Sequence, residues 1–170
     1  MKKTKVTFIT EAAVIAALYT VLVLVFSFSS FGPIQFRVAE ALTVLPYFTP
    51  AAIPGLAIGC FLSAIFAGAD VLDIIFGSLA TLVAAILSYQ LRRYKFLVPI
   101  PPILANMIVV PWVLRFAYGE AQPIYLMMLS VGAGELLAAG VFGTILLLAL
   151  APIKRFIFRN NTNTELHNRV

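Results

Sequence analysis

The chain has 170 residues, of which 62% are apolar and 11% are charged. A soluble domain carries about a quarter charged residues and about half apolar ones, so this composition argues against a water-soluble enzyme or a disordered regulator. The net charge of +5 could suit a nucleic acid, but the basic residues lie at the ends of apolar blocks, where they set orientation in a membrane. We therefore expect an all-α, polytopic membrane protein that lies in a lipid bilayer and has no nucleic-acid partner.

The sequence also lacks the residues for much metal and ATP chemistry. Cys60 is the single cysteine and His167 the single histidine, which leaves little from which to build a disulfide framework, a zinc site or a haem site. The sequence contains no G-x-x-x-x-G-K-[ST] pattern, so ATP hydrolysis by a P-loop mechanism is excluded. We expect no metal, no cofactor and no enzymatic activity.

Six apolar blocks separated by Gly, Pro, Ser and charged residues predict six transmembrane helices in one bundle. The first block is too long for the apolar region of a cleaved signal peptide, so we interpret it as a helix. The predicted helices cover about residues 6–28, 37–48, 54–67, 70–91, 99–116 and 124–150. They form one transmembrane domain over residues 1–159, followed by a polar cytoplasmic tail over residues 160–170.

The distribution of Lys and Arg predicts the orientation of the six helices. On the side shared by both termini lie Lys2, Lys3, Lys5, Arg92, Arg93, Lys95, Lys154, Arg155, Arg159 and Arg169. The other side carries only Arg37 and Arg115. Because cytoplasmic loops are enriched in basic residues, both termini are expected in the cytoplasm.

Polar side chains within apolar helices are the candidate site residues, because a charge at a helix centre costs about 2.5–3.5 kcal/mol on insertion scales. Most of them fall in the outer half under this topology, where one pocket could collect them. Asp70 could instead act as a helix N-cap, with Asp73 as an acidic residue of the first turn. Arg37 and Glu40, three residues apart, could pair only with each other. Glu135 is the hardest to explain by a structural role, since it lies deep in the last helix.

Small residues recur four apart on the first helix. Ala12 and Ala16 form one such pair, and Ala13 and Ala17 form another. This spacing lets a second helix approach closely. Spacing alone favours packing inside the bundle over docking of a separate protein.

Two stretches carry a resemblance to a known family. They are Phe31-Gly-Pro-Ile-Gln-Phe-Arg-Val-Ala-Glu-Ala-Leu-Thr-Val-Leu-Pro-Tyr-Phe-Thr-Pro-Ala-Ala-Ile-Pro-Gly-Leu and Asp73-Ile-Ile-Phe-Gly-Ser-Leu-Ala-Thr-Leu-Val-Ala-Ala. Both resemble the QueT family, which is assigned to the substrate-binding S-components of energy-coupling factor (ECF) transporters for queuosine precursors. The resemblance covers the membrane portion of the chain. Ala64 departs from relatives that carry Asn there, so a polar ligand contact is missing or is supplied by another residue.

The resemblance implies a bacterial cell-membrane protein that binds a small solute from outside and releases it inward. It implies two kinds of partner, a transmembrane T-component and two cytosolic ATPases, which use the ATP. It also implies a T-component docking surface on the first helix. The residues of that surface would be Ala12, Ala13, Ala16 and Ala17.

The implied ligand has chemistry that these side chains can match. Prequeuosine (7-aminomethyl-7-deazaguanine) and queuine both carry a guanine-like donor edge, which a carboxylate can accept, and an amine, which a second carboxylate can hold. We expect Glu40 or Glu135 at the base edge and Asp73 or Asp70 at the ammonium, with a lid over residues 27–36.

Aromatic faces would stack on the ring of this ligand, and the candidates for that role include Tyr47. The expected substrate-binding residues are Gln35, Phe36, Arg37, Glu40, Asp70, Asp73, Asn106, Trp112, Tyr118 and Glu135.

Three alternatives remain open. The same architecture could bind another base, a vitamin or a metal ion. The chain could be a stand-alone ion-coupled carrier that uses Glu135 or Asp73 as its proton site. A membrane enzyme built on Asp70 and Asp73 is the third alternative.

Overall fold

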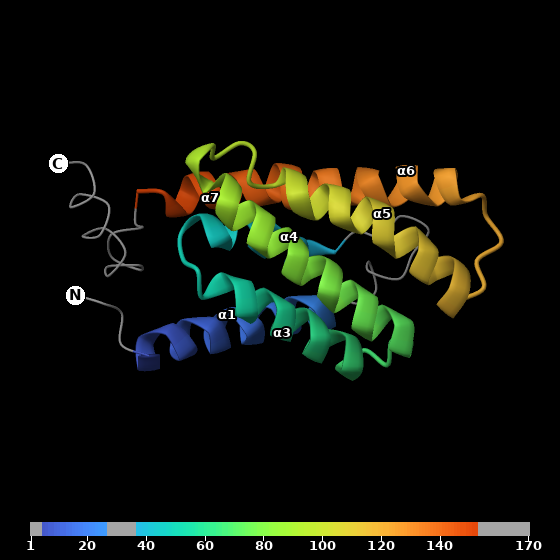
Figure 1. Ribbon diagram of the computed structural model, residues 1–170, viewed down its shortest axis with the longest axis horizontal. Helices are drawn as coiled ribbons and strands as arrows, with labels where there is room; N and C mark the ends of the chain where they lie inside the picture. The colour runs from blue at the N-terminus through green and yellow to red at the C-terminus, as the bar shows by residue number, and fades with distance from the viewer. Residues whose placement is uncertain (1–4, 27–36, 153–170) are drawn as a thin grey trace.

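The computed structural model describes residues 5–26 and 37–152, and these ranges consist of helices with short connections (Figure 1). The elements in chain order are α1 (Lys5–Val25), η1 (Val38–Tyr47), α3 (Ala52–Phe66), η2 (Asp73–Gly77), α4 (Ser78–Gln90), η3 (Leu91–Arg93), α5 (Ile100–Ala117), α6 (Ile124–Glu135), η4 (Leu136–Phe142) and α7 (Gly143–Leu150). The predicted all-α fold is confirmed over this part of the chain. The predicted helices over 70–91 and 124–150 each contain a wider π-helical segment.

Four continuous helical stretches among the described residues are long and apolar enough to cross a membrane: Lys5–Val25, Asp73–Arg93, Ile100–Ala117 and Ile124–Leu150. Helices η1 and α3 are shorter. At about 2.0 Å per residue for a 3₁₀ helix and 1.5 Å for an α-helix, they extend about 20 Å and 22 Å. A hydrocarbon core is about 30 Å thick. The count of six complete spans therefore stays a prediction.

The helices run alternately along one axis. Figure 1 shows that α1 begins, and α7 ends, at the same end of the molecule, where the α4–α5 connection also lies. Arg92, Arg93 and Lys95 belong to this connection. The distribution of basic residues predicts that this end faces the cytoplasm, and this orientation stays a prediction.

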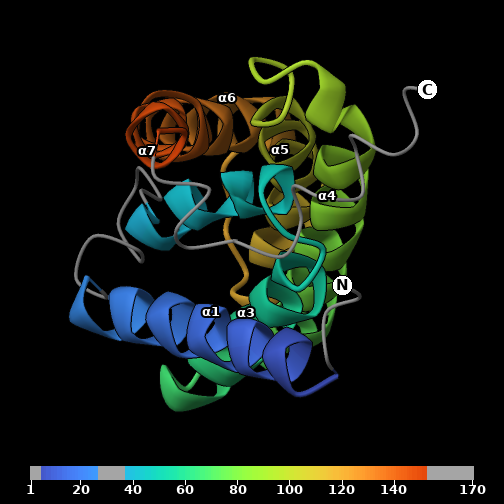
Figure 2. The same ribbon diagram turned by 90° about the vertical axis from the view of Figure 1, so that its left-hand side faces the viewer.

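Helices α1 and α3 lie side by side and pack closely (Figure 2). A Cβ atom added at Gly55 would lie 2.8 Å from the Ala12 carbonyl oxygen, and one added at Gly59 would lie 2.9 Å from that of Ala16. The backbones can approach this closely only because these positions are small. The Thr20 hydroxyl adds a hydrogen bond of 3.2 Å to the Gly59 carbonyl.

Helix η1 passes through the middle of the bundle, between α1 and α3 on one side and η4 and α7 on the other (Figure 2). It is a 3₁₀ helix of ten residues that contains Pro46, and most of its side chains are buried. Because a 3₁₀ helix has three residues per turn, positions three apart lie on one face. Arg37, Glu40 and Thr43 follow this spacing. A helix was expected at residues 37–48, but its 3₁₀ form was not.

The two π-helical segments of the described chain each adjoin an acidic residue. Segment η2 starts at Asp73, and η4 starts directly after Glu135. π-Helical turns are rare and occur frequently at functional sites. Both acidic residues are buried in the bundle.

Candidate functional site

The first part of the candidate site is centred on Glu40, whose side chain is only 1% exposed. The Tyr19 hydroxyl of α1 donates a hydrogen bond of 2.6 Å to Glu40 Oε1. The second carboxylate oxygen, Oε2, is buried without a hydrogen-bond partner among the described residues. An unpaired buried polar atom is unfavourable, so this oxygen is an acceptor that a ligand donor could satisfy.

A second buried carboxylate, Glu135 of α6, repeats this arrangement. Asn106 of α5 donates a hydrogen bond of 2.8 Å from Nδ2 to Glu135 Oε1, and Glu135 Oε2 has no partner in the described part of the chain. Asn106 also faces Glu40, and the two carboxylates interact electrostatically. The structure thus brings together three expected site residues, Glu40, Asn106 and Glu135, from three different helices.

The second part of the site is centred on Asp73, at the start of η2. Arg37 Nη2 lies 3.7 Å from Asp73 Oδ2, which also accepts a hydrogen bond of 3.3 Å from the Tyr118 hydroxyl. Partial burial raises the pKa of Tyr118 above its ordinary value, so the phenol stays protonated and donates. Arg37 therefore pairs with Asp73 and reaches Glu40 only electrostatically, and the expected i, i+3 pairing of Arg37 with Glu40 is replaced by a contact between helices.

Asp70 has the capping role that its sequence position suggested. Its Oδ1 accepts the Leu72 backbone N–H at 2.9 Å, and its own N–H donates to the Tyr118 hydroxyl at 3.1 Å. Asp70 is only half-buried, whereas Asp73 is buried. Of the two aspartates, Asp73 is the one that lines the cavity.

A cavity of about 30 Å³ opens beside Arg37 and Asp73. Its polar lining comes from Tyr19, Arg37, Ser63 and Asp73, and its remaining walls from Val23, Cys60, Ala64, Ala67 and Ala69. A space of this size holds about one or two water molecules. Ala64, where the sequence comparison with the family raised the question of a missing polar contact, is one of the apolar walls.

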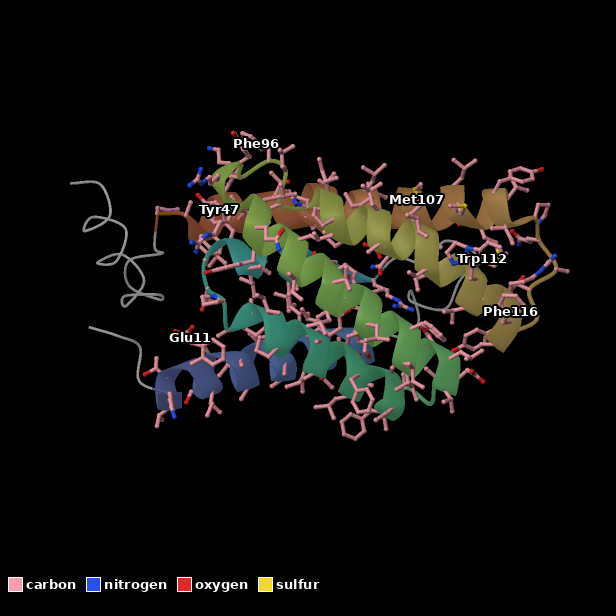
Figure 3. All side chains as sticks on the ribbon, viewed as in Figure 1. Glu11, Tyr47, Phe96, Met107, Trp112 and Phe116 are labelled. Carbon is pink, nitrogen blue, oxygen red and sulfur yellow. The ribbon has the colours of Figure 1, made fainter. Side chains whose placement is uncertain are left out.

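Several expected site residues do not join these clusters. Trp112 is 47% exposed and stacks on Phe116, with the ring centroids 6.2 Å apart (Figure 3). Tyr47 packs edge-on against Phe48 near the opposite end of the molecule (Figure 3). Gln35 and Phe36, and the expected lid over residues 27–36, lie outside the described residues.

Tyr19 is the clearest site residue that the sequence reasoning missed. Its ring suits an apolar helix, which conceals the polar hydroxyl, but its position along α1 indicates that it faces inward. It follows Ala12 and Ala16 at helical spacing, on the stripe of α1 that faces the protein interior. Cys60 and Ser63 of α3 were missed as well, and both are buried against the same cavity.

The four alanines of α1 that were expected to dock a partner differ in their exposure. Ala12 and Ala16 are buried against α3, where the two backbones meet, and therefore do not lie on the outer surface. Ala13 and Ala17 are exposed. The expectation of one four-alanine docking surface is corrected to two faces, of which only the Ala13 and Ala17 face is accessible to another protein.

Fold and site together define an all-helical protein, over the described residues, with several helices able to span a membrane and a small, charged cavity between them. This is an arrangement suited to a transporter of a polar solute. The family model described as "QueT transporter" matches residues 9–152, and the chain belongs to this transporter family.

A curated relative supports the same assignment. The "Queuosine precursor transporter QueT" of Lactococcus lactis subsp. cremoris (strain MG1363) is 42% identical over 85 residues, which cover 49% of this chain and 50% of that protein. The match thus spans about half the length of the relative. No solved structure matches the chain.

Proposed function

We propose that this chain is the substrate-binding subunit of an ECF-type importer and that it binds a queuosine precursor, a 7-substituted 7-deazaguanine. Membership of the QueT family supports the transport role, and the name of the Lactococcus relative supports the substrate class. The observation that carries the proposal is the pair of buried carboxylates, Glu40 and Glu135, each with one oxygen that has no partner among the described residues.

These two oxygens suit the donor-rich edge of a deazaguanine. The ring N1–H and the 2-amino group are adjacent donors, and ionised carboxylates are acceptors only. A base placed between Glu40 and Glu135 would satisfy oxygens that are unpaired without it. The Asn106 amide, which faces both carboxylates, would lie beside such a base.

Asp73 is the residue proposed to hold the ammonium arm of prequeuosine. It lines the cavity, whereas Asp70 is engaged in capping. Two opposite charges about 4 Å apart gain roughly 4 kcal/mol at an effective dielectric constant of 20, before desolvation is counted. The nearby Arg37 guanidinium holds the Asp73 carboxylate in position.

Ligand binding requires the cavity to widen, because about 30 Å³ is far below the several hundred Å³ typical of a small-molecule site. Helix η1 lies between α1 and η4; it carries Glu40 and follows directly after Arg37. A shift of η1 relative to these neighbours would enlarge the space beside Tyr19 and Asp73. Such a shift would admit the solute, and the return of η1 would enclose it, as closing lids do.

The proposed partners are a transmembrane T-component and two cytosolic ATPases in the bacterial plasma membrane, with both chain termini on the cytoplasmic side. Ala13 and Ala17 on the exposed side of α1 are the proposed docking positions for the T-component. Small side chains there would let a partner helix approach closely.

Titration calorimetry of the purified full chain with prequeuosine tests the substrate, with guanine and riboflavin as controls. We expect tight binding of prequeuosine and much weaker binding of guanine, which lacks the ammonium arm. If guanine bound as tightly as prequeuosine, Asp73 would not contribute to binding through the ammonium arm. Lack of prequeuosine binding would overturn the proposed substrate and leave the family assignment intact.

The buried carboxylates also suit a second candidate, a stand-alone proton-coupled carrier that uses Glu135. Reconstitution of the chain alone in liposomes distinguishes the two functions. Uptake of prequeuosine driven by a pH gradient, without partner proteins or ATP, would favour the carrier. Uptake that requires the T-component, the ATPases and ATP would favour the importer subunit.

A further inference from the structure

The charges that meet around η1 do not balance. Asp73, Glu40 and Glu135 could together carry three negative charges, and Arg37 supplies one positive charge among the described residues that face them. Segment 27–36, which precedes η1, contains no charged residue and no histidine, so it cannot supply a cation. With all three carboxyls ionised, the cluster would keep two negative charges that no cation of residues 5–26 or 37–152 facing it compensates.

The unpartnered carboxylate oxygens show which residues would carry the excess negative charge. Asp73 has Arg37 and Tyr118 as partners. Glu40 and Glu135 each use one oxygen, and their second oxygens are buried without a partner in the described ranges. An isolated ionised carboxylate in an apolar interior is strongly unfavourable, and such a group is neutralised instead. Two adjacent carboxylates can avoid the repulsion when one of them holds a proton.

We propose that Glu40 and Glu135 jointly hold a proton in the empty protein and that the donor edge of the bound base replaces it, so that ligand binding releases about one proton to the solvent. This inference rests on the proposed function, because it takes the ligand to be a deazaguanine. The proton leaves a carboxylic acid, which becomes a carboxylate. The ring N1–H and 2-amino group then donate to the carboxylate without losing their own protons.

Several of the elements around the pair contribute titratable, charged or polar groups that face it. They are Tyr19 of α1, Arg37 beside η1, Cys60 of α3 and Asn106 of α5, and Arg37 connects them to Asp73 of η2. Arg37 is a permanent cation and Asn106 does not titrate, while the Tyr19 hydroxyl is already a donor to Glu40. Asp73 is paired with Arg37. The exchangeable proton is therefore assigned to the two glutamates.

The release predicts a direction for the pH dependence. If one proton leaves on binding, the affinity for the ligand rises with pH by about tenfold per pH unit while the pair is protonated. It becomes independent of pH once the pair is ionised in the empty protein. A site that binds without proton exchange shows no such slope.

The test is calorimetry of the full chain with prequeuosine in buffers of equal, near-neutral pH and different ionisation enthalpies. The slope of observed enthalpy against buffer enthalpy gives the number of protons exchanged, and we expect a release of about one. Clear binding with zero slope overturns the inference while keeping the proposed function. Absence of binding heat with unchanged melting on ligand addition overturns both.

A second ligand identifies the source of the proton. The nitrile precursor, 7-cyano-7-deazaguanine, has the same donor edge and no amine, so the same release is expected. Release with prequeuosine alone would place the proton on the ligand arm and overturn the inference.

Two variants test whether the released proton comes from Glu40 and Glu135. Glu135→Gln should reduce the release to near zero, and Glu40→Gln provides the same test if the first variant does not fold. Glu120→Gln, in the exposed α5–α6 connection, should keep the release of the unmodified chain. Unchanged proton release in a folded Glu135→Gln or Glu40→Gln protein would overturn the inference.

Discussion

Asn106 and Glu135 are joined by a hydrogen bond of 2.8 Å that links α5 to α6 inside the bundle. The bond uses one carboxylate oxygen and leaves the other without a partner among the described residues. Tyr19 and Glu40 form the equivalent pair between α1 and η1, again with one oxygen unpaired. Two helix-linking bonds thus orient two acceptors into the same region, which is a suitable arrangement for recognising a ligand with adjacent donors.

Replacement of Glu40 by Gln should weaken prequeuosine binding by at least about tenfold, or roughly 1.4 kcal/mol. The amide oxygen of Gln can still accept the Tyr19 hydroxyl, so the melting temperature without ligand should change little. Calorimetry and thermal unfolding measure the two effects, and Glu120→Gln is the matched control. Unchanged affinity would show that Glu40 has only a structural role.

Tyr19→Phe removes the donor that fixes Glu40. We expect a loss of about 1–3 kcal/mol in stability, because a buried carboxylate oxygen loses its partner, together with weaker ligand binding. Thermal unfolding with and without prequeuosine measures both effects. Tyr125→Phe is the matched control, because Tyr125 is 64% exposed and its replacement should leave both measurements unchanged. A Tyr19→Phe protein with normal stability would contradict the importance of the bond.

Asp73→Asn should weaken binding of prequeuosine by at least about tenfold and should affect the nitrile precursor much less. The substitution removes the negative charge that attracts the ammonium arm, and it leaves the Arg37 guanidinium without its counter-charge. Asp70→Asn is the matched control, since an Asn side chain can still cap the helix. Equal losses for both ligands would place Asp73 away from the ammonium.

Gly59→Ala should destabilise the protein by about 1–3 kcal/mol, the usual range for overpacking. The added Cβ would lie 2.8 Å from Tyr19 Cβ and 2.9 Å from the Ala16 carbonyl oxygen, and neither can move without shifting α1. Gly140→Ala is the control, because its Cβ would meet Ile103 Cδ1 at an ordinary 3.7 Å. Thermal unfolding compares the two variants, and equal melting temperatures would argue against tight α1–α3 packing.

Ala13→Trp and Ala12→Trp test the two faces of α1. Ala13 is exposed, so its replacement should abolish co-purification with the T-component and spare ligand binding. Ala12 is buried against α3, so its replacement should destabilise the chain itself. Val83→Trp, at an exposed position of α4, should change neither property. Normal assembly of the Ala13→Trp protein would place the docking surface elsewhere.

Much of the architecture could be predicted from the order of apolar blocks and breakers. Gly and Pro end helices for local steric reasons, so the predicted helices over 54–67, 99–116 and 124–150 agree with α3, α5 and the α6–α7 stretch within a few residues. Asp70 as a cap was predictable as well, because capping depends on neighbours in sequence. The 3₁₀ form of η1 and the π-helical turns were not, since they depend on packing against other helices.

The alanines on α1 likewise show what the sequence could predict and what depends on packing. Their spacing predicted that they allow a close approach of another helix, but not which helix. Packing against α3 buries Ala12 and Ala16 and leaves Ala13 and Ala17 exposed, because successive residues on a helix point in different directions.

Composition and the order of apolar blocks were enough to predict a helical protein of membrane composition, with a few polar groups whose burial needs an explanation. Its apolar content and the scarcity of charge are sufficient for that conclusion. Which polar groups meet depends on how the helices pack. Tyr19 and Glu40 are 21 positions apart, and Asn106 and Glu135 are 29 apart. No local pattern links residues at such separations, so only the packing of whole helices against one another brings them together.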